Sequence, residues 1–251
     1  MGLDIGFGKI RTMPIGGTSS GCIYMPTFCA DVGLDADSLW ASVQGAAFIP
    51  PEDPAAMHRG HPLARAKLYV DFNEPGKTCI YNFPGFKYAA VKYYKRATEV
   101  EWIMPAYEAL RAMPGMVYNQ AIVTMYRDGT DAISWHNDKP KSIVPDSVVF
   151  DVSLGAERTF HVRKNATTGE EITQVMAHGS AIAFTTSFNE THQHAVLPAM
   201  AGAEPRASIV FRNIADVLND EELVRAIAKA EKEKARRDKA KASKRASNKT
   251  K

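Results

Sequence analysis

Between residues 118 and 214, short apolar runs alternate with turn residues. Asp128-Gly129 is a turn of the hairpin type, and Gly155, Gly169 and Gly179 separate later runs. Many short strands with turns between them are typical of a closed or two-sheet β architecture, in which inward side chains surround a central cavity. We therefore predict a mainly β fold with flanking helices, built on a double-stranded β-helix (jelly roll), with strands at residues 121–126, 148–154, 159–163, 172–176, 181–186, 195–197 and 207–213.

The region before residue 118 has a different pattern. Residues 1–36 are rich in Gly, Thr, Ser and Pro and show little periodicity, so we expect loop. A short helix capped by Asp37 is predicted over residues 37–48, and a strand over residues 64–72. Helical spacing of apolar residues then covers residues 99–113.

The chain end also carries a helix signal. Asn219, followed three residues later by Glu222, forms a capping-box sequence, and this predicts a last helix that grades into a basic tail. We expect three parts: an N-terminal extension (1–117) whose helix and hairpins act as a substrate lid, the jelly-roll core (118–216), and the C-terminal helix with its tail (217–251).

Composition narrows the class of protein. With 251 residues, 45% of them apolar, the chain suits one sizeable globular domain with an appendage. No run approaches the roughly 20 apolar residues of a membrane span, and the N-terminus lacks the pattern of a secretory signal. Its three cysteines are too few and too scattered for a disulfide framework or a zinc cage. We expect a monomer that is not bound to membrane and not secreted, located in the cytoplasm or, in a eukaryote, in the nucleus.

Charge is unevenly distributed along the chain. Residues 229–251 hold eleven Lys/Arg and three Asp/Glu, whereas the whole chain has a net charge of only +3. Such a basic segment can neutralise phosphates and release counterions, so nucleic acid, DNA or RNA, is the expected partner. The alternatives are a solvated, disordered tail or one that packs on an acidic partner.

Candidate metal chemistry begins at His136-Asn137-Asp138. Residues i and i+2 of a strand point to the same side, so His136 and Asp138 can bind one metal ion while Asn137 faces away. A second histidine, His194, comes later in the chain. Two imidazoles and one carboxylate form the facial triad that holds non-haem Fe(II) and leaves coordination positions open. His192, two positions earlier on the same face, is an alternative second ligand.

Two arginines follow this histidine, Arg206 and Arg212. The planar guanidinium group binds a carboxylate through two parallel hydrogen bonds, and a carboxylate buried without such a partner is very costly. An arginine here could therefore pair a dicarboxylate co-substrate, and the whole set points to oxygen chemistry driven by 2-oxoglutarate. For Arg212, a surface position at a strand end is the alternative.

Several motifs in this order resemble the AlkB family of Fe(II)/2-oxoglutarate-dependent dioxygenases, the nucleic-acid dealkylases. The resemblance extends over about residues 118–214, less than half of the chain. More weakly, residues 65–72 and 81–88 resemble the family's substrate-lid hairpins. The motifs that carry it are 125–138 (MYRDGTDAISWHND), 152–160 (VSLGAERTF), 177–180 (AHGS), 194–198 (HAVLP) and 206–212 (RASIVFR), which fits the family's Arg-x₅-Arg ending.

The resemblance implies a role for each motif residue. His136, Asp138 and His194 would bind Fe(II), which favours His194 over its neighbour. Arg206 would pair the distal carboxylate of 2-oxoglutarate. Arg212 would lie beside the iron, near the co-substrate end that the metal binds.

Further residues would complete the co-substrate site. The hydroxyl of Tyr126 would hydrogen-bond 2-oxoglutarate. Thr124 and Ser208 stand where the family often carries asparagine, and both still offer hydrogen-bonding groups. The implied cofactor is Fe(II), with 2-oxoglutarate and O₂ as co-substrates.

Substrate recognition is where the chain departs from the family. A base must leave its stack to reach such a cavity, and exposed aromatics assist by stacking. Phe83 and Phe86 are candidates for this, with packing against the barrel as the alternative. The family's acidic residue two positions after the metal aspartate suits a cationic base such as 1-methyladenine or 3-methylcytosine, but here Pro140 lies between Lys139 and Lys141. These two lysines are candidate substrate residues.

Three functions are therefore considered. The resemblance implies oxidative removal of N-linked methyl groups from nucleic-acid bases, with release of formaldehyde, succinate and CO₂. The departure at Pro140 motivates an alternative, hydroxylation of a base or a protein side chain without demethylation. A non-catalytic nucleic-acid-binding module is the third, and the intact ligand set argues against it.

Overall fold

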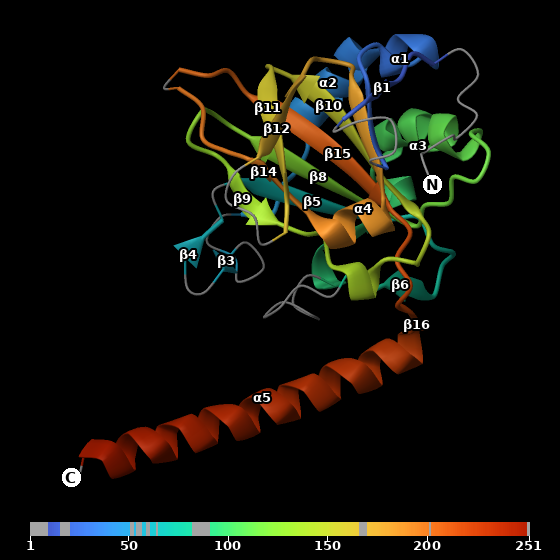
Figure 1. Cartoon of the computed structure of the whole chain (residues 1–251). Helices are drawn as coiled ribbons and strands as arrows, with labels where there is room; N and C mark the ends of the chain where they lie inside the picture. Colours follow the sequence, from blue (N-terminus) through green and yellow to red (C-terminus); the bar gives the residue numbers. More distant parts are fainter. Residues whose placement is uncertain are drawn as a thin grey trace.

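Two β-sheets pack face to face in the computed structural model of the chain, which describes residues 10–15, 21–50, 53, 57–58, 61–63, 65–81, 91–165, 170–200 and 202–249 (Figure 1). All pairings in the larger sheet are antiparallel except that of β5 with β7. In spatial order its strands are β1 (Met13–Pro14), β2 (Cys22–Met25), β13 (Ala181–Thr185), β10 (Val148–Gly155), β15 (Arg206–Arg212), β8 (Gln120–Tyr126), β5 (Ala66–Asp71) and β7 (Tyr94–Arg96).

The smaller sheet is antiparallel throughout. Its strands are, in order, β12 (Glu171–Met176), β11 (Arg158–Lys164), β14 (His192–Val196) and β9 (Ile133–His136). Two further pairs lie outside both sheets, β16 (Val217–Asn219) with β6 (Lys77–Cys79) and β3 (Met57–His58) with β4 (His61–Pro62). This arrangement confirms the predicted mainly β, jelly-roll fold.

The large sheet separates two apolar cores. Because side chains alternate across a strand, Ala207, Ile209 and Phe211 of β15 face the helices, whereas Arg206 and Ser208 face the smaller sheet. Helices α2 (Ala36–Gln44) and α3 (Met104–Arg111) contribute to the first core, and aromatic residues of both sheets line the second. The polar face of β15 is therefore enclosed between the sheets.

The remaining helices lie at the margins of the sheets. α1 (Phe28–Asp31) follows β2, and α4 (Thr186–Thr191) connects β13 to β14. Short 3₁₀ helices are η2 (Val91–Tyr93), η3 (Ala97–Glu99), η4 (Glu101–Ile103) and η5 (Pro140–Ser142).

Within the described residues, none of the helices combines the length and apolar character that crossing a membrane requires. All three cysteines are described and buried, and none forms a disulfide.

Three predictions for the flanks need correction. Residues 1–36 are not all loop, since β2 is a buried strand of the large sheet; its run of four apolar residues shows no alternation because both faces are covered. The first long helix is capped by Asp35, whose Oδ1 accepts from the Ser38 amide at 3.0 Å, and not by Asp37. Of the helix expected over residues 99–113, only α3 is α-helical, and two 3₁₀ turns precede it.

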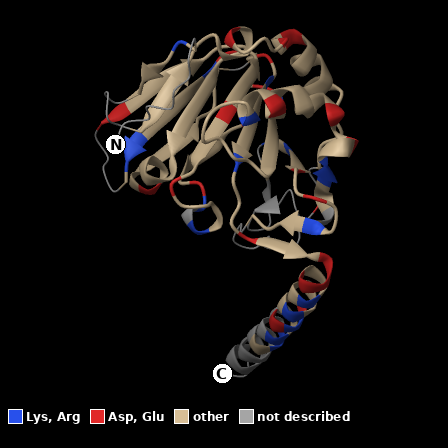
Figure 2. Cartoon of the chain, turned by 90° about the vertical axis from the view of Figure 1, so that its right-hand side faces the viewer, with Lys and Arg blue, Asp and Glu red and all other residues tan. Residues whose placement is uncertain are grey.

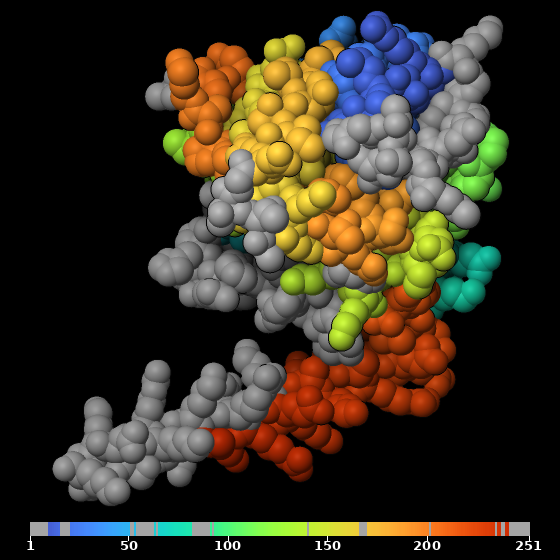
Figure 3. Space-filling view, viewed as in Figure 1, coloured from blue at the N-terminus to red at the C-terminus, as the bar shows by residue number. Residues whose placement is uncertain are grey.

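The predicted capping box is present. The Asn219 amide donates to Glu222 Oε2, and the Glu222 amide donates to Asn219 Oδ1, both at 2.9 Å. It starts α5 (Asp220–Lys249), which extends away from the two sheets (Figures 1 and 3). Its main contacts with the domain, among the described residues, are with β16 and β6.

Candidate metal centre

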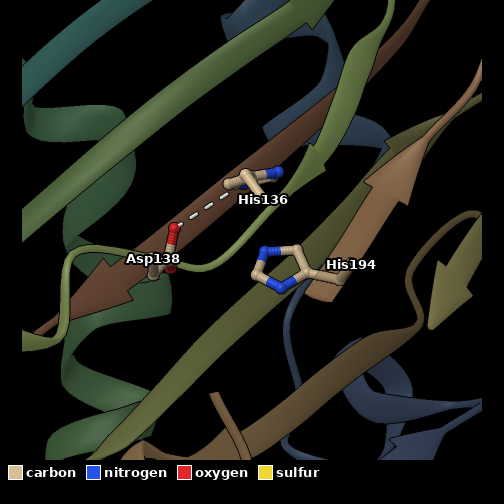
Figure 4. A group of neighbouring side chains, drawn as sticks. All are labelled: His136, Asp138 and His194. Carbon is tan, nitrogen blue, oxygen red and sulfur yellow. Dashed lines mark ion pairs between the residues drawn. The ribbon is translucent and has the colours of Figure 1, made fainter. Parts of the chain in front are cut away.

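Three side chains from the smaller sheet and its edge converge between the sheets. His194 of β14 and His136 of β9 are register partners, and their ring centroids are 4.3 Å apart. Asp138 follows two residues after His136, and the three potential ligand atoms lie within 4.8 Å of one another (Figure 4). Asn137 faces away, since its Nδ2 donates to the His192 carbonyl at 2.8 Å. The structure thus brings together the three residues that the sequence singled out.

Each imidazole is held in a state suited to metal binding. His136 Nδ1 lies 2.9 Å from the Ser134 carbonyl, so this nitrogen carries the proton and Nε2 is left toward the centre. Burial, and then the neighbouring His194, lower the pKa of His136 to about 3. Burial also lowers the pKa of His194. Both rings are therefore neutral near pH 7, as a metal ligand must be.

His194 is packed among aromatic rings. Its ring stacks on Phe160 at 5.4 Å and tilts against Phe184 at 5.2 Å. Its Nδ1 is buried and has no hydrogen-bond partner among the described residues. His192, by contrast, stacks on Phe188 at 4.3 Å and lies outside the group.

The two oxygens of Asp138 have different partners. Oδ2 accepts from Arg212 Nε at 2.9 Å and contacts Arg212 Nη2 at 2.7 Å. Oδ1 lies 3.8 Å from His136 Nε2 and accepts from the Tyr81 hydroxyl at 3.5 Å. Burial opposes ionisation of Asp138, but Arg212 and the imidazoles hold its pKa below the usual range. The carboxylate therefore stays charged and presents one oxygen to the centre.

Asn189 of α4 fixes the backbone beneath this carboxylate. The Asp138 amide donates to Asn189 Oδ1, and Asn189 Nδ2 donates to the Asp138 carbonyl, both at 2.8 Å. Asn189 is fully buried. This residue was not predicted as a site residue, because nothing in its local sequence pattern shows what it contacts.

The buried guanidinium of Arg206 is suited to binding a carboxylate. Its side chain is 0% exposed, and its Nε donates to Ser153 Oγ at 3.1 Å. Nη1 and Nη2 are buried without a partner among the described residues. Unpaired donors on a buried guanidinium are costly, and a carboxylate with two oxygens would satisfy both. The residues present therefore fit 2-oxoglutarate.

The other expected co-substrate residues lie on the same face of the sheet. Arg206 is the register partner of Tyr126, and the Cζ atom of Arg206 lies 5.1 Å from the ring centroid of Tyr126. Two residues further along β15, Ser208 is the register partner of Thr124 on β8 and of Ser153 on β10, so these three residues form the next row across the sheet. Arg212, two rows further along the same strand, contacts the Asp138 carboxylate rather than forming the surface strand end that was the alternative.

One acidic residue of this face was not anticipated. Asp151 lies on β10, two residues before Ser153, with 8% exposure. Burial raises its pKa to about 6, although the charges of Arg206 and Arg212 lower it. A lone Asp within an apolar strand was the signal that could have revealed it, because such a residue needs a buried polar setting.

The substrate candidates are only partly described. Phe83 and Phe86 lie outside the described residues. Lys139 is half-buried, and its backbone amide donates to the Tyr81 hydroxyl at 3.3 Å. Lys141 is exposed. Tyr81 itself, with Arg212 Cζ 5.2 Å from its ring centroid, was not predicted as a site residue.

Comparison with known proteins agrees with this geometry. The sequence model of the 2OG-Fe(II) oxygenase superfamily matches residues 33–239. Over 165 residues the chain is 28% identical to the mouse (Mus musculus) DNA oxidative demethylase ALKBH2, covering 61% of this chain and 67% of that protein. Over 108 residues it is 27% identical to the human (Homo sapiens) alpha-ketoglutarate-dependent dioxygenase alkB homolog 3, covering 40% of this chain and only 38% of that protein.

A solved structure shares the fold. The structure of OsALKBH1 superposes with a TM-score of 0.50 at 14% sequence identity, covering 80% of this chain and 100% of that chain. This likeness concerns the fold alone.

Proposed function

The chain belongs to the AlkB family of the 2OG-Fe(II) oxygenase superfamily, and on this premise we propose that it oxidatively removes N-linked methyl groups from nucleic-acid bases. The match to the superfamily model and the His136, Asp138 and His194 group confirm the family, the enzyme class and the Fe(II) and 2-oxoglutarate requirement that the sequence predicted. The observation that carries the proposal is the guanidinium fork of Arg206, which is buried without a partner among the described residues on the face of β15 that looks toward the His136, Asp138 and His194 group.

The chain's own residues would divide the binding tasks. His136, Asp138 and His194 would hold Fe(II), while Arg206 and Tyr126 would hold the distal carboxylate of 2-oxoglutarate. When bound, Fe(II) and 2-oxoglutarate together activate O₂, so that one oxygen atom enters succinate, CO₂ is lost, and the other oxygen enters a C–H bond of the substrate.

Loss of the methyl group then needs no further oxidant. In an N-hydroxymethyl product the C–N bond breaks, its electron pair goes to the base nitrogen, and the carbon leaves as formaldehyde. The hydroxyl proton is released. A neutral base is left with a negatively charged nitrogen that is reprotonated, whereas a cationic base becomes neutral without taking up a proton. The protein contributes position and exclusion of water rather than acid–base catalysis, in keeping with the buried setting of the site.

Arg212 supports this chemistry by occupying Oδ2 of Asp138. Burial alone would lower its pKa, but Asp138 raises the pKa of Arg212 above the ordinary value. The guanidinium is therefore permanently charged, and Asp138 is left with Oδ1 as a single ligand atom. One-atom ligation leaves coordination positions for a co-substrate and O₂.

Nucleic acid as the partner is supported by α5. The helix begins with Asp220, Glu221 and Glu222 and then becomes basic, as the colours of Figure 2 show. Lys229, Lys232, Arg236 and Lys239 are all exposed along it. Exposed cations on an arm that leaves the domain suit binding to nucleic-acid phosphates.

The test is a panel of methylated DNA and RNA oligonucleotides incubated with Fe(II), ascorbate and 2-oxoglutarate, with oligonucleotide mass and succinate both measured. The expected result is a loss of 14 mass units (one CH₂), about one succinate per methyl removed, and no reaction with His136→Ala. A gain of 16 mass units, or about one oxygen atom, without methyl loss would instead establish the hydroxylase alternative. Succinate without any change in nucleic acid would contradict demethylation and base hydroxylation, and would leave only the hydroxylation of a protein side chain.

A further inference from the structure

Asp151 is a buried carboxylate on the face of the large sheet that looks toward the smaller sheet. It lies on β10 with 8% exposure, and its register partners on the neighbouring strands are Val210 and Ile182, both part of the second apolar core. Its Oδ1 is buried without a hydrogen-bond partner among the described residues. An ionised carboxylate is costly in such a position, so the charges around Asp151 decide whether it carries a proton.

The row of Asp151 lies between the two arginines of β15. Asp151 shares its face of β10 with Ser153, whose Oγ accepts from Arg206 Nε at 3.1 Å. Its own row across the sheet comes after that of Arg206 and before that of Arg212, and neither arginine forms an ion pair with it among the described residues. Arg212 contacts the metal ligand Asp138. A ligand that reaches from the Arg206 fork to the metal group therefore has to pass the row of Asp151.

The charges that act on Asp151 come from several elements. Burial raises the pKa of Asp151 to about 6, the charges of Arg206 and Arg212 lower it, and Asp138 raises it. Neighbouring β13 adds no charge, since its sequence is AIAFT. The other titratable groups between the sheets are Lys67 and Tyr69 of β5, Tyr126 of β8, His136 of β9 and His194 of β14.

We propose that 2-oxoglutarate binds beside the neutral, protonated form of Asp151, which donates a hydrogen bond to the co-substrate, so that about one proton is taken up with each molecule bound. The proton comes from solvent and attaches to the Asp151 carboxylate, and no bond of the co-substrate is made or broken. This role rests on the proposed pairing of Arg206 with the distal carboxylate. It does not depend on which substrate is oxidised.

Pairing of Arg206 with the co-substrate is the physical cause of this proton uptake. In the free enzyme the guanidinium charge of Arg206 favours the ionised form of Asp151. A co-substrate carboxylate in the fork balances that charge, and Arg212 is already paired with Asp138. Asp151 then faces a ligand with two negative charges. When carboxylates share a buried site, the pKa of one of them rises strongly, so Asp151 takes up a proton and becomes a donor.

The consequence is a co-substrate affinity that falls as the pH rises. Below a pH of about 6, Asp151 is protonated with and without ligand, so it adds no pH dependence. Above that pH, binding has to draw a proton from solvent, and each further pH unit weakens it by up to about tenfold until the pKa of the bound state is reached. The carboxyl groups of 2-oxoglutarate itself are ionised throughout this range, since carboxyl groups ordinarily titrate near about pH 4.

The test is calorimetric titration of 2-oxoglutarate into the full-length, Mn(II)-loaded protein under anaerobic conditions, where no turnover occurs. For the wild type we expect the Kd to rise by about tenfold or more between pH 6 and pH 8. Titrations at pH 7.5 in Hepes and in Tris, whose ionisation enthalpies differ, count the protons exchanged. The uptake should lie between about 0.5 and 1 proton per co-substrate.

Variants assign the proton to Asp151. Asp151→Asn has no charge but keeps a donor, so its Kd should not change with pH, and at pH 8 it should bind 2-oxoglutarate about tenfold more tightly than the wild type. Asp151→Leu has neither charge nor donor, and should bind about fivefold more weakly than Asp151→Asn at every pH. A pH dependence that stems from Lys67 or the imidazoles would persist in both variants and is subtracted.

Glu190→Gln is the matched control, because Glu190 is an exposed carboxylate of α4, and it should follow the wild type in affinity and in proton uptake. Circular dichroism establishes that each variant is folded, and Asp151→Asn preserves the test if Asp151→Leu is not.

The outcomes separate the role of Asp151 from that of Arg206. Wild-type binding without proton uptake, or uptake that persists in Asp151→Asn, would overturn this inference. Weaker binding by Asp151→Asn than by the wild type at pH 8 would also overturn it, since ionised Asp151 would then serve the site. Unchanged 2-oxoglutarate binding by Arg206→Met would instead contradict the proposed pairing of Arg206 on which the inference rests.

Discussion

Asn189 and the backbone of Asp138 exchange two hydrogen bonds of 2.8 Å across 51 positions of sequence. The pair joins α4 to the loop after β9, the two segments that flank the metal centre. Because both groups of the Asp138 peptide are fixed, the carboxylate above them can turn only about its own side-chain bonds. Asn189 thereby orients a ligand without touching the metal.

Asn189→Ala should weaken metal binding by roughly 10–100-fold, the usual effect of removing a group that orients a ligand. The measurement is Mn(II) or Co(II) titration by calorimetry. Asn119 offers a matched control, since it makes the same two-bond contact with the backbone of Ile214 at 2.9 and 2.7 Å. Asn119→Ala should lose a similar amount of stability and keep its metal affinity, and equal metal affinities in the two variants would refute the orienting role.

Arg206→Met should abolish co-substrate binding without lowering the stability of the protein. Removing a buried guanidinium whose Nη groups have no partner among the described residues should leave the melting temperature of the metal-free protein unchanged or raise it. Addition of 2-oxoglutarate with Mn(II) should stabilise the wild type, by about 2.7 kcal/mol at a hundred times Kd, and not the variant. Arg163→Met is the control, because Arg163 lies over Trp135 at 4.1 Å, away from the centre, and should keep the ligand-induced shift.

Asp151 gives a prediction on pH. Its pKa is about 6 in the folded protein against an ordinary 3.8, so ionisation destabilises the fold as pH rises from about 4 to 6, and the full penalty is present above 6. Asp151→Asn should raise the free energy of unfolding at pH 8 by up to about 3 kcal/mol, with most of this gain lost near pH 4. Urea unfolding at both pH values measures it. An equal gain at both would show that ionisation is not the cause, and Glu190→Gln, an exposed carboxylate of α4, should change neither.

Deleting residues 229–251 should weaken nucleic-acid binding and flatten its salt dependence, because eleven Lys/Arg leave with the segment. Anisotropy of a labelled oligonucleotide at several salt concentrations measures both. Turnover of 2-oxoglutarate should persist, since the main contacts of α5 with the domain are at β16 and β6. A full-length variant with the tail Lys and Arg changed to Gln keeps the chain length, and it should behave like the deletion. Unchanged affinity in both would contradict the role of the tail.

Local sequence patterns predicted much of the fold. Short apolar runs between turns predicted most strands of the jelly-roll core, and the Asn219–Glu222 spacing predicted the start of α5, because each of these signals acts within a few residues. β2 and β9 were not predicted as strands. A four-residue strand with no alternation is recognisable only once its neighbours β1 and β13 are in place.

The sequence by itself determined the chemistry of this protein, since the spacing of His136 and Asp138 and the pair Arg206 and Arg212 already specify a metal and a dicarboxylate. The tertiary structure then excluded the alternative His192, because His194 is the register partner of His136. It also brought Asn189 under Asp138, and Lys67 into the row of Thr124. The physical reason is that strand register and the packing of sheet on sheet join residues far apart in the chain, whereas sequence patterns report only on neighbours.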